Sequence, residues 1–223
     1  MHWQDEGYLL AKSNFSENSI IIQTFTINHG KYSGIVYGGS SKRTKKYFQI
    51  GNKISLNWKA KGENKIGYFN VELIKPISPL FFDDKKRSIC ILAASSILKI
   101  LLPERQVNKK IFQSFDNFIN HLHDKDWIKL YILWELSLIK ELGFEVTIPI
   151  RKSDSTEKIN SIEINGKIFK VPELLLNMGS KAISVLDVVE ALHFNKNLII
   201  ENFLAPNKLK FPLSRNILEK YFN

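Results

Sequence analysis

In the first third of the chain, hydrophobic and polar residues alternate with the two-residue period of β-strands, and glycine and asparagine interrupt the pattern. Residues 53–61 show it best, because their apolar side chains alternate with Lys, Ser and Asn. Successive side chains of a strand point to opposite faces, so the pattern places Trp58 in a core. The period predicts five strands, at residues 7–12, 19–26, 31–37, 49–61 and 66–75.

Five short strands in this part of the chain favour a small closed barrel, and the OB-fold is a five-stranded form of such a barrel. In the fifth strand, the same period directs Phe69 inward and Tyr68 outward. An outward tyrosine is either ordinary surface or a platform on which a nucleic-acid base stacks. The sequence therefore predicts an OB-fold domain at residues 1–80, with Tyr68 as a candidate contact to a base.

Beyond the proline-containing segment 75–79, the hydrophobic period becomes that of helices. Asp83 or Asp84 is placed to cap the first helix, and Gly143 is placed to end the third. Because the first three helices are strongly apolar, we expect them to pack together as a bundle. The predicted helices lie at residues 84–102, 109–123, 126–142, 185–193 and 213–222, and a small hairpin lies at 161–171.

These patterns predict an α+β fold of two domains. An N-terminal five-stranded OB-fold barrel at residues 1–80 is followed by a mainly α-helical domain at residues 81–223. Within the second domain, residues 144–182 show no regular period. With 44% hydrophobic residues, the chain of 223 residues has enough apolar side chains to form a real core.

The charge of the chain is positive and unevenly distributed. The net charge is +10, and residues 1–80 contain 11 Lys or Arg against 5 Asp or Glu. The densest cluster follows the third predicted strand in a segment that we call the basic loop, residues 38–46. Its two glycines precede four cations in five positions, which are Lys42, Arg43, Lys45 and Lys46.

Cations packed this closely repel one another unless solvent or an anionic partner screens them. The loop is therefore either a solvated turn or a contact for nucleic-acid phosphates, which release counterions when they are neutralised.

Catalytic and metal-binding patterns are absent from the sequence. Cys90 is the single cysteine, so no internal disulfide forms, and its apolar surroundings favour a core residue. His121 and His123 would point away from each other on a helix. The loop Gly-Gly-Ser-Ser-Lys-Arg-Thr lacks the spacing of a phosphate-binding P-loop. We expect no enzyme activity, no catalytic residues, no cofactor and no metal.

The sequence also predicts where the protein resides. The first residues contain neither a basic stretch nor an apolar stretch of the kind that secretory signals have. The most apolar run, residues 89–102, is shorter than the ~20 residues of a membrane span. We therefore expect a soluble cytoplasmic protein with no membrane contact.

A collinear series of short motifs runs along nearly the whole chain. It begins with M-H-W-Q-D-E-G-Y-L-L, continues with G-I-V-Y-G-G-S-S-K-R at residues 34–43, and includes Trp134-Glu135 and Leu142-Gly143-Phe144. This series resembles the RecO family of bacterial recombination mediators, in its alphaproteobacterial form. Many members bind zinc through four cysteines in the region corresponding to 145–182, whereas this chain has no cysteine after Cys90. The resemblance therefore does not imply zinc, and the irregular segment 144–182 replaces the zinc-binding region.

The resemblance implies binding without turnover. Family members bind single- and double-stranded DNA, anneal complementary strands, and help to load the recombinase RecA together with RecR. They also contact the C-terminal tail of the single-strand DNA-binding protein. A cytoplasmic, nucleoid-associated protein of DNA repair and homologous recombination is therefore expected.

For such binding we assign the phosphate contacts to the four cations of the basic loop. Lys59 and Lys61 extend this track, and Tyr68 is the candidate for stacking. Two other functions fit the same residues. One is a protein-interaction adaptor, in which the helical domain is the working part and the barrel only docks. The other is an RNA-binding OB protein, although the sequence has no feature that reads a 2′-hydroxyl.

Overall fold

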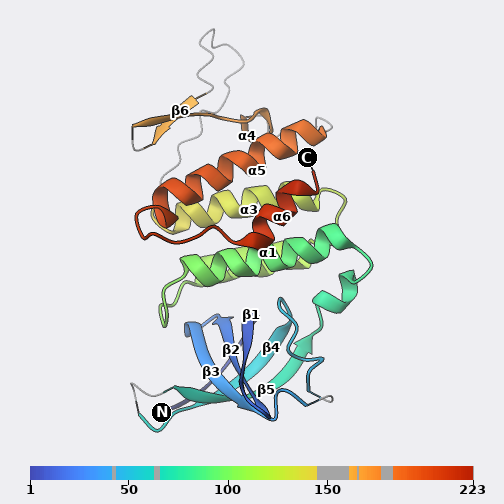
Figure 1. Ribbon diagram of the computed structural model, residues 1–223, viewed down its shortest axis with the longest axis vertical. Coiled ribbons are helices and arrows are strands. Elements are labelled where there is room, and N and C mark those ends of the chain that lie inside the picture. The colour runs from blue at the N-terminus through green and yellow to red at the C-terminus, as the bar shows by residue number, and fades with distance from the viewer. Residues whose placement is uncertain (42–43, 63–65, 145–160, 165, 177–182, 223) are drawn as a thin grey trace. The chain divides into compact units, whose positions relative to one another are not determined.

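The computed structural model describes residues 1–41, 44–62, 66–144, 161–164, 166–176 and 183–222. Figure 1 shows β-strands in the N-terminal part of the chain and mainly helices after them. The chain divides into two compact units, Met1–Ile119 and Asn120–Asn223. The predicted class is confirmed, because a closed five-stranded barrel comes first and a mainly helical region follows.

The first unit is built on a closed barrel of five strands with the order β1-β2-β3-β5-β4 (Figure 1). Strand β4 pairs back with β1, and β3 and β5 form the one parallel pair of the barrel. This is the strand order of an OB-fold. The strands are β1 (His2–Ser16), β2 (Ser19–Thr26), β3 (Gly30–Tyr37), β4 (Lys53–Lys59) and β5 (Gly67–Lys75).

The period-two pattern predicted the core of the barrel correctly. Trp58 is 2% exposed, and Ile54, Leu56 and Phe69 are also buried. Two strands, β1 and β4, differ from the prediction by more than one residue. Strand β1 is longer at both ends because it pairs with β2 along one edge and with β4 along the other.

Strand β4 begins at Lys53 and not at residue 49 because the preceding residues form turns. Gly51 has a φ of 90°, which is favourable only for glycine. The Asn52 side chain is buried, and its Oδ1 accepts the backbone N–H groups of Ile77 at 2.8 Å and Ser78 at 3.2 Å. Asn52 thereby ties the start of β4 to the segment that follows β5.

Two helices pack with the barrel in this unit. After a short 3₁₀-helix, η1 (Ser78–Phe81), α1 spans Lys85–Leu101 and α2 spans Lys109–Asn120. Asp84 caps α1, as predicted, because its side chain accepts the backbone N–H of Arg87 at 3.0 Å. The rings of Phe112 and Phe115 on α2 pack against Tyr8 of β1, with centroid distances of 5.8 and 4.9 Å.

The expectation of a single three-helix bundle stays a prediction. Helices α1 and α2 belong to the compact unit of the barrel, because aromatic side chains on the outside of β1 and β2 bury part of the apolar stripe of α2. The third helix, α3 (Trp127–Glu141), packs against α5 (Val185–Ile199) in the other unit. Whether residues 1–80 form a domain by themselves stays a prediction.

The second unit adds short elements to this helix pair. They are the hairpin β6 (Ser161–Ile164) and β7 (Lys167–Lys170), α4 (Glu173–Leu176), the π-helical turn η2 (Ile200–Leu204) and α6 (Leu213–Lys220). Ser184 and Asp187 form a capping box at the start of α5. The predicted irregular segment 144–182 lies largely outside the described residues. Among the helices of the described part, none has the length and apolarity needed to cross a bilayer.

Candidate nucleic-acid interface

The basic loop connects β3 to the turns before β4. Gly38 has a φ of 71°, and the backbone carbonyl of this glycine accepts the N–H of Ser41 at 3.2 Å and the hydroxyl of Thr44 at 2.8 Å. These bonds close a tight turn that leaves Lys45 and Lys46 exposed to solvent. The other two predicted phosphate contacts, Lys42 and Arg43, lie outside the described residues.

The remaining predicted residues lie on neighbouring strands. Lys59 ends β4, and Lys61 lies in the connection that follows; both side chains are exposed. Lys59 is the register partner of Tyr68 on β5, so the structure brings these two predicted residues together. The described contacts thus place the predicted site in two groups, the basic loop and the adjoining edges of β4 and β5.

An aromatic residue that the sequence analysis missed lies beside Tyr68. Tyr37, the last residue of β3, is 67% exposed, and its ring centre is 6.1 Å from that of the half-buried Tyr68, with the planes tilted by 53°. We call Tyr37 and Tyr68 the aromatic pair. They meet because β3 and β5 run parallel with Ile35 opposite Tyr68. The period of β3 was the available signal, because Val36 is buried in the core and its neighbour must therefore point outward.

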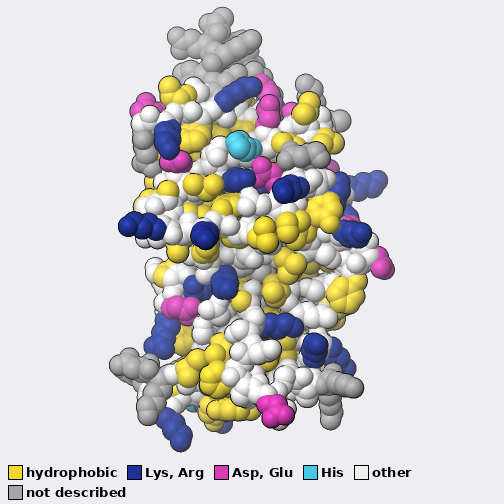
Figure 2. Space-filling model, in the orientation of Figure 1, with side chains coloured by type: hydrophobic (Ala, Val, Ile, Leu, Met, Phe, Trp, Pro, Cys, Tyr) yellow, Lys and Arg dark blue, Asp and Glu magenta, His cyan; other side chains and the backbone are white. Residues whose placement is uncertain are grey.

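The aromatic pair and the cations together have the composition of a surface for single-stranded nucleic acid. Tyrosine faces accept bases of any identity by stacking, and lysine ammonium groups neutralise the phosphates between them. Burial of the pair is incomplete, so the rings are available to a ligand. Figure 2 shows that Lys and Arg side chains are spread over the viewed face.

Other kinds of site find little support in the described residues. Within them, no group of three His, Cys, Asp or Glu side chains lies close enough to hold a metal ion. Cys90 is buried in α1. Trp58, the aromatic residue of β4, points into the barrel and is unavailable for stacking on a ligand.

Comparison with protein families finds two matches along the chain. The model of the recombination protein O N-terminal domain matches residues 1–77, and that of the recombination protein O C-terminal domain matches residues 83–148. Together they cover more than half of the chain. The first match coincides with the barrel, and the second with α1, α2 and α3.

Curated relatives match over the same stretch. The DNA repair protein RecO of Wolbachia sp. subsp. Drosophila simulans is 34% identical over 150 residues, which are 66% of this chain and 62% of that protein. The protein of the same name from Cereibacter sphaeroides is 33% identical over 144 residues, covering 65% and 60%. That of Roseobacter denitrificans is 29% identical over 149 residues, covering 66% and 62%. The matched part of the chain thus spans less than two thirds of the length of these relatives.

Proposed function

Because the chain belongs to the RecO family, we propose that it is a mediator of DNA repair and homologous recombination that binds single-stranded DNA with its N-terminal barrel and anneals complementary strands. The observation that supports this most directly is the position of the aromatic pair beside Lys59 on the outer surface of an OB-fold barrel. This surface offers stacking and charge without groups arranged to read base edges. It therefore suits a protein that handles any sequence.

Annealing places a specific physical demand on such a surface. Two strands approach against the repulsion of their phosphates, while the base edges must stay free to pair. Cations that neutralise phosphates reduce the repulsion, and rings that stack on base faces leave the Watson–Crick edges open. Lys42, Arg43, Lys45 and Lys46 are the proposed phosphate contacts, with Lys59 and Lys61 extending the track. No bond is made or broken in this process, so we propose a protein that is not an enzyme.

The proposed partners follow from the family. They are single- and double-stranded DNA, RecR, the C-terminal tail of the single-strand DNA-binding protein and, indirectly, RecA. With RecR, the protein would load RecA on strands that the single-strand DNA-binding protein covers. The proposed location is the cytoplasm, in association with the nucleoid.

The decisive experiment measures binding and annealing by the full chain over a salt series. Changing the four cations of the basic loop to Gln should weaken binding to all single-stranded sequences alike. Since each phosphate contact contributes about 0.7 to the log–log salt slope of a single strand, the slope should fall by about 3. Unchanged affinity at low salt would exclude the basic loop.

A matched control separates local charge from overall charge. Changing four exposed lysines elsewhere to Gln removes the same total charge, and suitable positions are Lys85, Lys109, Lys125 and Lys210. We expect this control to bind and anneal nearly as well as the unchanged protein. Annealing should be faster with the protein than without it, should fade as salt rises, and should persist when the strands are coated with their binding protein.

One observation favours the adaptor as a second candidate function. Four large apolar side chains of the second unit are strongly exposed, namely Ile168, Val185, Leu186 and Leu213. Where exposed apolar residues form one contiguous patch, they are typical of surfaces that bind other proteins. Substituting Leu186 and Leu213 by Ser should leave DNA binding intact in either case. Loss of partner binding together with weak annealing by the unchanged protein would favour the adaptor.

The third alternative is an RNA-binding protein. Stronger binding to RNA than to DNA in direct competition would favour it.

A further inference from the structure

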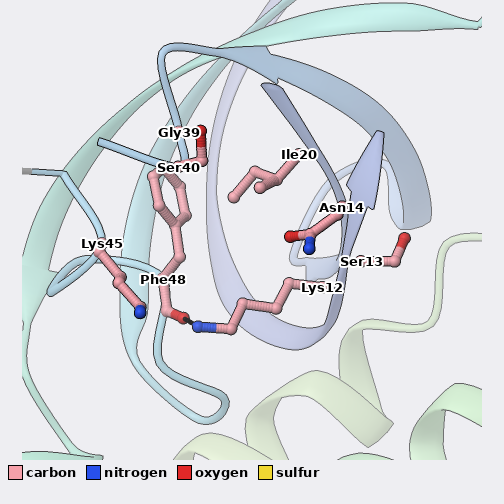
Figure 3. Close-up of a pocket in the computed structure, with 8 residues that line it drawn as sticks. All are labelled: Lys12, Ser13, Asn14, Ile20, Gly39, Ser40, Lys45 and Phe48. Carbon is pink, nitrogen blue, oxygen red and sulfur yellow. Dashed lines mark hydrogen bonds between the residues drawn. The ribbon is translucent and has the colours of Figure 1, made fainter. Parts of the chain in front are cut away.

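A groove beside the basic loop brings together two lysines that lie far apart in the sequence. It has a volume of about 520 Å³ and lies between β1, β2 and the loop that follows β3 (Figure 3). Lys12, Ser13 and Asn14 line it from β1, and Ile20 lines it from β2. Gly39, Ser40, Lys45 and Phe48 complete its lining from the loop side.

The two lysine side chains approach Phe48 in the groove from opposite sides (Figure 3). Nζ of Lys12 donates to the backbone carbonyl of Phe48 at 2.5 Å, and Figure 3 shows the Lys45 side chain pointing toward the same carbonyl from the other side. Burial, followed by the charge of Lys45, lowers the pKa of the Lys12 ammonium. The groove thus holds two like charges that disfavour each other, and none of the eight described residues that line it is a carboxylate.

The remaining lining residues are either polar or part of the barrel core. Ile20 and Phe48 belong to the buried core of the barrel and form the floor of the groove, and the Asn14 amide points into it (Figure 3). A Cβ at Gly39 would lie 2.6 Å from Cγ1 of Ile20, so only glycine lets the backbone pack this closely against the wall of the groove.

We propose that this groove binds one phosphodiester of single-stranded DNA, with Lys12 and Lys45 neutralising the phosphate. This inference rests on the proposed DNA binding of the barrel and adds Lys12 to it, a residue outside the basic loop. A bound phosphate removes the repulsion between the two ammonium groups, which gives the site its selectivity for an anion.

The test compares single lysine variants of the full chain with an oligodeoxythymidine that has hydroxyl groups at both ends. Lys12→Gln should lower the affinity about 5- to 10-fold at low salt, as expected when one charge-assisted contact is lost, and should reduce the log–log salt slope by about 0.7. Lys109→Gln removes the same charge from α2, away from the groove, and should change the affinity less than about twofold. Lys12→Arg keeps the charge and should bind nearly as well as the unchanged protein.

A second readout reports on the groove itself. In ¹⁵N-labelled protein, the oligonucleotide should shift the backbone amide signals of Gly39 and Phe48, and these shifts should be lost in Lys12→Gln. Equal affinities of Lys12→Gln and Lys109→Gln, with no such shifts, would overturn the proposal that the groove binds a phosphodiester. If the variant with all four cations of the basic loop changed to Gln still lost affinity, the proposed DNA binding would stand without a contribution from the groove. Failure of the unchanged protein to bind any single strand would instead reject the proposed function.

A third arm identifies the source of the phosphate. The oligonucleotide with hydroxyl ends contains only phosphodiesters, so an effect of Lys12→Gln on this ligand supports the inference. An effect confined to a 5′-phosphorylated oligonucleotide would overturn it, because the groove would then bind a terminal phosphate monoester.

Discussion

Arg215 and Glu135 form a two-point ion pair that is completely buried in the second unit. Nε of Arg215 donates to Oε1 of Glu135 at 2.7 Å, and Nη2 donates to Oε2 at 3.1 Å. The hydroxyl of Tyr131 also donates to Oε1 at 2.6 Å, and Nη2 of Arg215 donates to the carbonyl of Leu192 at 2.7 Å. The pair thereby joins α3, α5 and α6, and Glu135 belongs to a motif that the sequence analysis singled out without assigning a role to it.

Removing one partner of this pair should strongly destabilise the second unit. Glu135→Gln leaves the buried guanidinium without its main counter-charge, and such a loss costs about 3–5 kcal/mol in the free energy of unfolding. Glu190→Gln, at an exposed position of α5, should cost less than about 0.5 kcal/mol. Urea unfolding followed through amide signals of α3 and α6 measures both. A cost below 1 kcal/mol for Glu135→Gln would contradict the assigned role.

The aromatic pair should contribute to DNA affinity in a way that salt does not change. Tyr37→Ala removes a stacking surface, and stacking of a base on an aromatic side chain contributes about 1–3 kcal/mol. Since stacking releases no counterions, the salt slope should stay the same while the affinity falls. Tyr37→Phe keeps the ring and should retain the affinity. Tyr221→Ala removes a partly exposed tyrosine of the second unit and serves as the control. Equal affinities of all three variants would exclude the pair from the interface.

Asp116 should hold α2 on the barrel. Its Oδ1 accepts the hydroxyl of Tyr8 at 2.6 Å and Nζ of Lys53 at 2.7 Å. Burial and then the bond to Asp116 raise the pKa of the Tyr8 hydroxyl, which therefore remains a donor at any ordinary pH. Asp116→Ala leaves both donors unpaired and should cost about 2–3 kcal/mol. Hydrogen exchange of β1 and α2 amides should become correspondingly faster. Exchange as slow as in the exposed-site control Asp83→Ala would refute this.

Asp5 should make the barrel sensitive to acid. Burial alone would raise the pKa of Asp5, but hydrogen bonds with His29 at 2.8 Å and with Asn28 and Glu6 lower it below the ordinary value of 3.8. A carboxyl group whose pKa is lowered by folding stabilises the fold when the pH is above its pKa in the unfolded state. This contribution disappears as the pH falls through its pKa in the folded state. The stabilising effect of Asp5 should therefore be constant near neutrality and be lost below pH 3.8.

The Asp5→Asn variant isolates this effect. The difference in unfolding free energy between the unchanged protein and Asp5→Asn should be largest above the ordinary pKa and should shrink on acidification. Denaturant unfolding at a series of pH values measures the difference. A difference that stays constant down to the lowest pH would show that the charge of Asp5 has no part in stability.

Local periodicity was sufficient to predict most elements of the fold. The second strand was predicted with its observed ends, and the cap of α1 was placed at Asp84 or its neighbour. The alternation of β4 placed Trp58 in the core and the adjacent lysines outside. These features depend on residues that are close together in the chain, because a repeat of two or of 3.6 residues already decides which side of an element is apolar.

The sequence by itself thus determined most of the elements, the inward faces of β4 and β5 and the excess of positive charge near the N-terminus. Only the tertiary structure decided which of these surfaces meet. Tyr37 reaches Tyr68 through the parallel pairing of β3 and β5, Lys12 meets Lys45 across a groove, and Phe112 and Phe115 of α2 pack on Tyr8 of the barrel. The physical reason is that periodicity records burial but not the identity of the covering partner, which depends on the path of the whole chain.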